Sequence, residues 1–182
     1  MTDGASPCCR TLRALRADVQ RLDPAAFARE HGDAFLVHHG PLGALEVEEG
    51  LKETRVTGDE QGVVDSFEPG EDFLVFAVRR RQPPTPDDDL VWLGRSEDND
   101  VVVPDATVSA IHAFFSRTPE GTFVIQDMNS MNGTELNGRP VPGQGMGSPL
   151  ALRTGSRLRL GSVNLTFLLA ADLHALVQRL LD

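Results

Sequence analysis

The sequence predicts a mainly β protein, a β-sandwich with an N-terminal helical extension and a C-terminal amphipathic helix. Many short apolar segments follow one another between 90 and 167 and are separated by turn signals, as in two-sheet folds. Apolar and polar residues alternate on both sides of Gly161-Ser162, which is typical of a hairpin with a two-residue turn. Helical spacing of apolar residues occurs near the two ends of the chain.

Composition and charge narrow the classes of function. The chain has 182 residues, 40% of them hydrophobic and 24% charged, which is enough for one domain with additions or for two small domains. The net charge is −10, whereas a general DNA-binding protein carries an excess of positive charge. Nine Phe, one Trp and no Tyr are also few rings on which to stack bases. We therefore expect no nucleic-acid partner.

Cysteine usage and hydropathy indicate the compartment. Cys8 and Cys9 are adjacent and cannot form a disulfide framework, so we interpret them as the start of a helix, with a soft-metal site as the weaker alternative. Arginines between Arg10 and Arg21 interrupt any signal-like apolar run. The longest apolar runs, such as Phe73–Val78, have six residues, whereas a membrane-spanning helix needs about 20. These features predict a cytoplasmic protein that does not insert into a membrane.

The N-terminal third is expected to be helical and then acidic. Ser6-Pro7 can begin a helix whose apolar face is Leu12, Leu15, Val19 and Leu22. Asp23-Pro24 begins a second short helix that Gly32 can end, and Ala34–Val37 is expected to be a strand. Residues 46–72 hold ten acidic residues and two basic ones, which predicts a solvated loop.

The remaining elements complete a three-part organisation. Phe73–Val78 is expected to be a strand buried on both faces, and the Pro- and Asp-rich stretch Gln82–Asp89 to be a loop. Asp172 is expected to cap a helix in which Leu173, Leu176, Val177, Leu180 and Leu181 form one apolar face. We predict an extension over 1–72, a sandwich over 73–168 and a helix over 169–182. Further strands are expected at Leu90–Leu93, Val101–Val103, Ile111–Phe115, Thr122–Ile125, Thr134–Leu136 and on both sides of the Gly161 turn.

Polar residues gather at the ends of the predicted strands, where binding residues on a rigid scaffold usually lie. An arginine, a serine hydroxyl and an asparagine amide in such loops are donors that suit an anion or a peptide backbone. The ordered motifs are Gly94-Arg95, Asn99 to Asp105, Ser109-x-x-His112, Asp127-x-x-Ser130-x-Asn132-Gly133-Thr134, Asn137-Gly138, Leu152-x-x-Gly155 and Gly161. In this order and spacing, the segment from Phe73 to Leu168 resembles a forkhead-associated (FHA) domain, a β-sandwich whose loops at one end bind phosphothreonine peptides.

The resemblance implies a role for each matching position. Arg95 would contact the phosphate, Ser109 would donate its hydroxyl to a phosphate oxygen, and Asn132 would hydrogen-bond the peptide main chain. Ala110 and Met131 complete the phosphopeptide-binding set, although the family often has polar or basic side chains there, and Met131 can donate only its backbone N–H. Structural support of the binding loops is implied for Gly94, which lets the strand end turn, for His112, which braces the loops, and for Gly133 and Asn137.

The function implied is a non-catalytic phosphothreonine-binding module that acts with a Ser/Thr kinase or its substrate. The alternative is a scaffold of the same fold that binds protein without phosphate, a hypothesis that rests on Ala110, Met131 and the acids near Arg95. An enzyme is the least favoured class, because no G-x-S-x-G, H-E-x-x-H or phosphate-loop motif occurs. We expect no cofactor and no metal, since His38-His39 would point to opposite faces of a strand.

Overall fold

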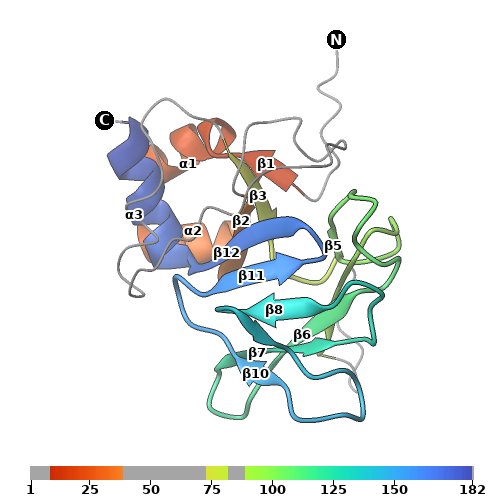
Figure 1. The fold of residues 1–182 in the computed structure, drawn as a ribbon. Coiled ribbons are helices and arrows are strands. Elements are labelled where there is room, and N and C mark those ends of the chain that lie inside the picture. Colours follow the sequence, from red (N-terminus) through yellow and green to blue (C-terminus); the bar gives the residue numbers. More distant parts are fainter. Residues whose placement is uncertain (1–8, 39–72, 82–88, 182) are drawn as a thin grey trace.

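The computed structural model describes residues 9–38, 73–81 and 89–181, in which strands form two sheets and helices pack at one side (Figure 1). Several predicted features lie outside the described residues: Ser6-Pro7, Cys8, the acidic stretch 46–72 and most of the predicted loop Gln82–Asp89. The strands are β1 (Cys9–Thr11), β2 (Ala34–His38), β3 (Leu74–Ala77), β4 (Val91–Gly94), β5 (Val101–Val102), β6 (Ala113–Arg117), β7 (Phe123–Asp127), β8 (Thr134–Leu136), β9 (Arg139–Pro140), β10 (Leu150–Ala151), β11 (Arg157–Leu160) and β12 (Val163–Leu169). The helices are η1 (Arg13–Leu15), α1 (Arg16–Arg21), α2 (Pro24–His31) and α3 (Ala170–Leu181).

The two sheets confirm the predicted sandwich. Within the described residues, one sheet has the strand order β1-β3-β2-β12-β11-β8-β9 and the other β10-β7-β6-β4-β5. Pairing is antiparallel except between β4 and β5, where Leu93 lies opposite Val101 in a parallel register. We refer to these as the seven-stranded and the five-stranded sheet.

Two apolar cores explain why the seven-stranded sheet is buried on both faces. Alternate residues of a strand point to opposite faces, and in β2 Leu36 faces the five-stranded sheet while Phe35 and Val37 face the helices. Figure 1 shows α1, α2 and α3 gathered on the side of this sheet away from β6, β7 and β10. We call these helices, with η1, the helical layer. Its buried apolar residues include Leu12, Leu15, Val19, Phe27, Leu173, Leu176 and Val177.

In the N-terminal region, the prediction for Cys9 is wrong and the predicted apolar face is confirmed. Cys9 does not begin a helix: it lies in β1, opposite Phe76 of β3, because the sheet edge offers it a backbone partner. The predicted apolar face from Leu12 to Leu22 is present, divided between η1 and α1. Because β1 and β2 belong to the same sheet as β3 and β12, this sheet crosses the boundary expected at residue 73.

The second helix and the C-terminal helix follow their local signals closely. Asp23 caps α2 by accepting a hydrogen bond from the Ala26 N–H at 2.8 Å, and Gly32 ends it with φ of 117°. The C-terminal helix begins at Ala170, so Asp172 lies in its first turn and is not the cap. Among the described helices, none combines the length and the hydropathy needed to cross a bilayer.

Two tight hairpins set the register of β8, β9, β11 and β12 in the seven-stranded sheet. Asn137 and Gly138 join β8 to β9 with φ of 51° and 78°, the paired left-handed conformations of a type I′ turn. Gly161 and Ser162 join β11 to β12, as the alternation in sequence predicts. A Cβ on Gly161 would lie 2.5 Å from the Thr107 carbonyl oxygen, so the turn packs directly against the loop that precedes β6.

Candidate functional site

Three loops meet at one end of the sandwich and bring together the predicted binding residues. Arg95 directly follows β4, Ser109 lies in the loop between β5 and β6, and Asn132 lies in the loop between β7 and β8. The Arg95 N–H donates to the Ser109 carbonyl oxygen at 2.9 Å, which joins the first two loops. The Asn132 side-chain amide donates to the Thr107 carbonyl oxygen at 2.8 Å, which joins the second loop to the third. We call residues 95–100, 103–112 and 128–133 the loop site.

Arg95 is exposed and presents its positive charge at the rim of the loop site. Its Nε donates to the Val108 carbonyl oxygen at 3.1 Å, which orients the guanidinium without neutralising it. Among the described residues no carboxylate forms an ion pair with it. Asp100, one of the acids that follow it in sequence, instead accepts from the backbone N–H groups of Arg81 and Trp92, each at 2.9 Å. The arginine is therefore available to an anion.

Ser109 and Met131 contact each other rather than acting separately. The Met131 N–H donates to Ser109 Oγ at 3.0 Å, which leaves the hydroxyl proton of Ser109 to be donated elsewhere. The backbone N–H, which is the only donor of Met131, is thus used within the loop site. Met131 is 90% exposed, and Ile111, also in the loop site, is 54% exposed. The loop site therefore also exposes apolar side chains.

His112 connects two of the loops from a fully buried position. Its Nδ1 accepts a hydrogen bond from the Ser109 N–H at 3.0 Å, so Nε2 carries the proton and donates to the Gly133 carbonyl oxygen at 3.1 Å. Burial lowers the pKa of His112, while its hydrogen bond to Gly133 acts in the opposite direction. The neutral ring thus fixes the spacing between Ser109 and the turn at Gly133, whose φ is 77°.

Gly94 is required for a different reason from the one expected. It lies within β4, and its φ is not in the left-handed region, so it does not serve as a turn. A Cβ at this position would lie 2.3 Å from the Ala110 carbonyl oxygen and 2.9 Å from Asn99 Nδ2. The absence of a side chain therefore allows the loop that carries Ser109 to approach the strand that carries Arg95. Ala110 provides this carbonyl oxygen, and Ala110 itself is exposed to solvent.

Three polar residues support the loop site without having been assigned a role from sequence. Asn99 is buried, and its Nδ2 donates to the carbonyl oxygens of Ser96 and Ala110. Asp127 accepts from the N–H and hydroxyl of Ser130 and from the hydroxyl of Thr134. The three-residue spacing of Asp127 and Ser130 is a recognisable signal, because an Asp side chain often accepts from an N–H a few residues on.

Thr107 is the third of these residues, and it fastens the Gly161 turn to the loop site. Its hydroxyl donates to Asp105 Oδ1 at 2.5 Å and accepts from the Ser162 N–H at 2.9 Å. The turn also donates from the Gly161 N–H to the Gly133 carbonyl oxygen at 3.2 Å. Asn137 lies at the other end of β8, where its Oδ1 accepts from the Arg157 N–H at 2.8 Å and fixes the β8–β9 hairpin to β11. These contacts are non-local, so sequence spacing alone does not reveal them.

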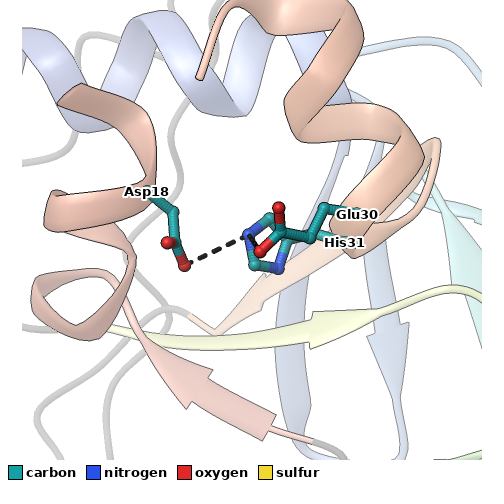
Figure 2. A group of neighbouring side chains, drawn as sticks. All are labelled: Asp18, Glu30 and His31. Atoms are coloured by element: carbon teal, nitrogen blue, oxygen red, sulfur yellow. Dashed lines mark ion pairs between the residues drawn. The ribbon is translucent and has the colours of Figure 1, made fainter. Parts of the chain in front are cut away.

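A possible metal-ligand cluster lies apart from the loop site, between α1 and α2. Ligand atoms of Asp18, Glu30 and His31 lie within 4.8 Å of one another, and Figure 2 shows Asp18 facing His31 across 3.2 Å. Arg21 Nη2 lies 3.1 Å from an oxygen of each carboxylate, so both acids already contact a cation. Burial, and after it the charge of Arg10, lowers the pKa of His31. We interpret the cluster as an ion-pair network that joins the two helices, and assign it no metal.

The chain is similar to known proteins over part of its length. Residues 91–161 match the model of the FHA domain. The chain is 39% identical over 75 residues to the oxoglutarate dehydrogenase inhibitor of Corynebacterium efficiens, a match that covers 41% of this chain and 48% of that protein. It is 37% identical over 75 residues to the glycogen accumulation regulator GarA of Mycolicibacterium smegmatis, with coverage of 41% and 43%.

A third similarity is to a transporter, and a fourth is to a solved structure. The chain is 38% identical over 77 residues to an ABC transporter ATP-binding/permease protein of Mycobacterium tuberculosis, over 42% of this chain and 8% of that protein. A structure of Mycobacterium tuberculosis EmbR with a low-affinity phosphopeptide has a TM-score of 0.39 and 29% identity, covering 46% of this chain and 20% of that one. The chain thus spans about half the length, or less, of the curated relatives it matches.

Proposed function

This chain contains a forkhead-associated domain, and we propose that the domain binds phosphothreonine peptides through the loop site. The observation that supports the proposal best is the convergence of Arg95, Ser109 and Asn132 from three loops, with the guanidinium of Arg95 held by a neutral carbonyl group. A phosphothreonine brings about −1.5 to −2 charges and three acceptor oxygens. Arg95 supplies the charge and the fork of donors, and Ser109 supplies a hydroxyl proton.

The roles of the individual residues follow from their hydrogen bonds. Ser109 Oγ already accepts from Met131, so its proton points to another acceptor, for which a phosphate oxygen is suitable. Asn132 uses one amide N–H on Thr107, and its carbonyl oxygen and second N–H can pair with the main chain of a peptide. Met131, Ile111 and Ala110 would contact apolar side chains next to the phosphothreonine.

We further propose that the protein is a non-catalytic partner of a Ser/Thr kinase or of a kinase substrate in the cytoplasm. Two of the relatives are an inhibitor and a regulator by name, which supports a regulatory role for this chain. None of the proposed roles requires a nucleophile or a cofactor, because each binding contact is a hydrogen bond or an ion pair. We propose neither a nucleic-acid partner nor insertion into a membrane.

Titration of matched peptides with and without phosphate tests the proposal. Fluorescence anisotropy with a phosphothreonine peptide library should give saturable binding, and Arg95→Ala should weaken it about 10- to 100-fold, because a charge-assisted hydrogen bond contributes about 1.5–3 kcal/mol. Arg139→Ala is a matched control, since Arg139 is exposed on β9, which belongs to the other sheet from β4 and is not part of the loop site. Equal binding of phosphorylated and unphosphorylated peptides would contradict the proposal.

The phosphate-independent scaffold remains a second candidate because Met131 and Ile111 expose apolar surface within the loop site. The same experiment separates the two functions. If a partner is retained by Arg95→Ala and lost by Met131→Asp, the scaffold is favoured. Loss of the partner in Arg95→Ala favours phosphothreonine recognition.

A further inference from the structure

A second pocket lies in the N-terminal half of the structure, against the helical layer. Its volume is about 430 Å³, which is within the range of small-molecule sites. Phe35 of β2 and Val75 and Ala77 of β3 form its apolar wall, and Phe35 pairs directly with Ala77 in the sheet. Leu15 and His31 line it from the helical layer. Four arginines complete the lining, and we call it the arginine pocket: Arg10, Arg79, Arg80 and Arg81.

Two arginines of the pocket, Arg79 and Arg81, are held by uncharged backbone groups. Among the described residues that line the pocket, Asp100 is the carboxylate, and both of its oxygens accept from backbone N–H groups. Arg79 donates to the carbonyl oxygen of Glu30 at 3.1 Å, and Arg81 donates to that of Glu97 at 2.8 Å. Backbone carbonyl groups orient a guanidinium but carry no net charge. These arginines are therefore positioned while keeping their attraction for an anion.

Arg10 adds to this charge from the other side of the pocket. Its ion pair with Asp18 is long, at 3.9 Å, and Asp18 also contacts Arg21 at 3.1 Å and His31 at 3.2 Å. One carboxylate is thus shared among three basic groups. Arg10 Nη1 lies 3.4 Å from His31 Nδ1, so the arginine faces a neutral ring as well as the acid. Asp18 consequently offsets only a part of the positive charge around the pocket.

We propose that the arginine pocket binds a small organic molecule with at least two anionic groups, carboxylate or phosphate, and a short apolar body. Guanidinium groups match the paired oxygens of both anions. The wall of Phe35, Val75 and Ala77 suits the apolar body, and the arginines around it suit charges at its ends. This site uses none of Arg95, Ser109 or Asn132, so it is separate from the loop site and from the function proposed for it.

Calorimetric titration with two probes tests the proposal and identifies the anion. Citrate presents carboxylates and pyrophosphate presents phosphates, and each is titrated into the full chain at matched ionic strength. Saturable binding is expected for at least one probe. The double variant Arg10→Gln with Arg79→Gln should weaken it at least about tenfold, because two charge-assisted contacts are lost. Circular dichroism confirms that the variant is folded.

Two controls make the outcome specific. Arg139→Gln with Arg153→Gln removes the same charge from exposed positions outside the pocket, and it should leave binding within about twofold of the wild type. Arg95→Gln should also leave binding of the probe within about twofold of the wild type, although it loses phosphopeptide binding. A failure of the arginine-pocket proposal is therefore distinguishable from a failure of the proposed function. Absence of saturable binding, an equal loss in the control double variant, or loss in Arg95→Gln would overturn the proposal.

Backbone NMR of the wild type gives a second readout that does not depend on the stability of any variant. On addition of the probe that binds, amide shifts are expected at Arg79, Arg81 and Phe35. Shifts confined to Ser109 and Met131 would instead place the anion at the loop site and overturn the proposal.

Discussion

The loop site and the helical layer are attached to the same sandwich by different kinds of contact. In the loop site, side chains such as His112 and Thr107 bond to the backbone of neighbouring loops. In the helical layer, apolar side chains such as Phe27 and Leu173 pack against the outer face of the seven-stranded sheet. Hydrogen bonds have strict geometry, whereas apolar packing is less directional. The difference suggests that the layer contributes stability and the loops contribute a defined binding geometry.

Removing an aromatic ring from the helical layer should have the largest effect on stability. Phe27 is fully buried, and its ring centroid lies 5.9 Å from that of Phe35 and 5.5 Å from that of His174. We expect Phe27→Ala to lower the free energy of unfolding by about 3–5 kcal/mol, because buried area is lost and a cavity remains. Urea denaturation followed by circular dichroism measures the change.

To test whether the helical layer affects binding at the loop site, a less destabilising variant that stays folded is needed. Phe27→Leu should be less destabilised and should bind a phosphothreonine peptide with unchanged affinity, since the ring does not contact the loops. Leu169→Ala, at a residue that is 39% exposed, is the control and should change stability by less than about 0.5 kcal/mol. A large loss of peptide affinity in folded Phe27→Leu would show that the two regions are not independent.

His112 should give an effect on stability that depends on pH. His112→Phe keeps a ring but leaves the Ser109 N–H and the Gly133 carbonyl oxygen without a partner, which costs about 1–3 kcal/mol for each such group at neutral pH. The pKa of His112 is lowered in the folded protein, so below about pH 6.5 the unfolded chain binds more protons and the wild type loses stability. The variant has no such group.

The difference in stability between wild type and His112→Phe should therefore be fully present above about pH 6.5 and shrink as the pH falls below it. Denaturation at several pH values measures both proteins under the same conditions, so other titrating groups cancel to first order. A difference that stays constant from pH 7.5 to 4.5 would contradict a buried neutral ring.

The smallest effect is expected at Met131. Because its side chain is 90% exposed, Met131→Ala should change the free energy of unfolding by less than about 0.5 kcal/mol. The affinity for phosphothreonine peptides with an apolar neighbour should fall severalfold, and the affinity for peptides with a polar neighbour should not. Met146→Ala, at a methionine that is 81% exposed, is a matched control. If Met131→Ala binds both peptides with the affinity of the wild type, Met131 is not part of the binding surface.

Local patterns predicted several turns, one helix start and much of the loop site. The alternation around Gly161, the Asn137-Gly138 turn and the Asp23-Pro24 helix start are each readable because neighbours in sequence decide them. The motif order from Gly94 to Gly133 likewise named residues that the structure brings together. The reason for Gly94 was wrong, because the close approach between Gly94 and Ala110 depends on how the loop before β6 packs against β4 in space.

By itself, the sequence determined where strands, turns and helices form and which polar residues stand at the strand ends. Only the tertiary structure decided that β1 and β2 join β3 and β12, that Thr107 holds the Gly161 turn, and that Arg10 meets Arg79 to Arg81 around one pocket. The physical reason is that periodicity reports which face of an element is apolar, but not which distant element covers that face. Register and side-chain contacts between such elements are fixed only when the whole core packs.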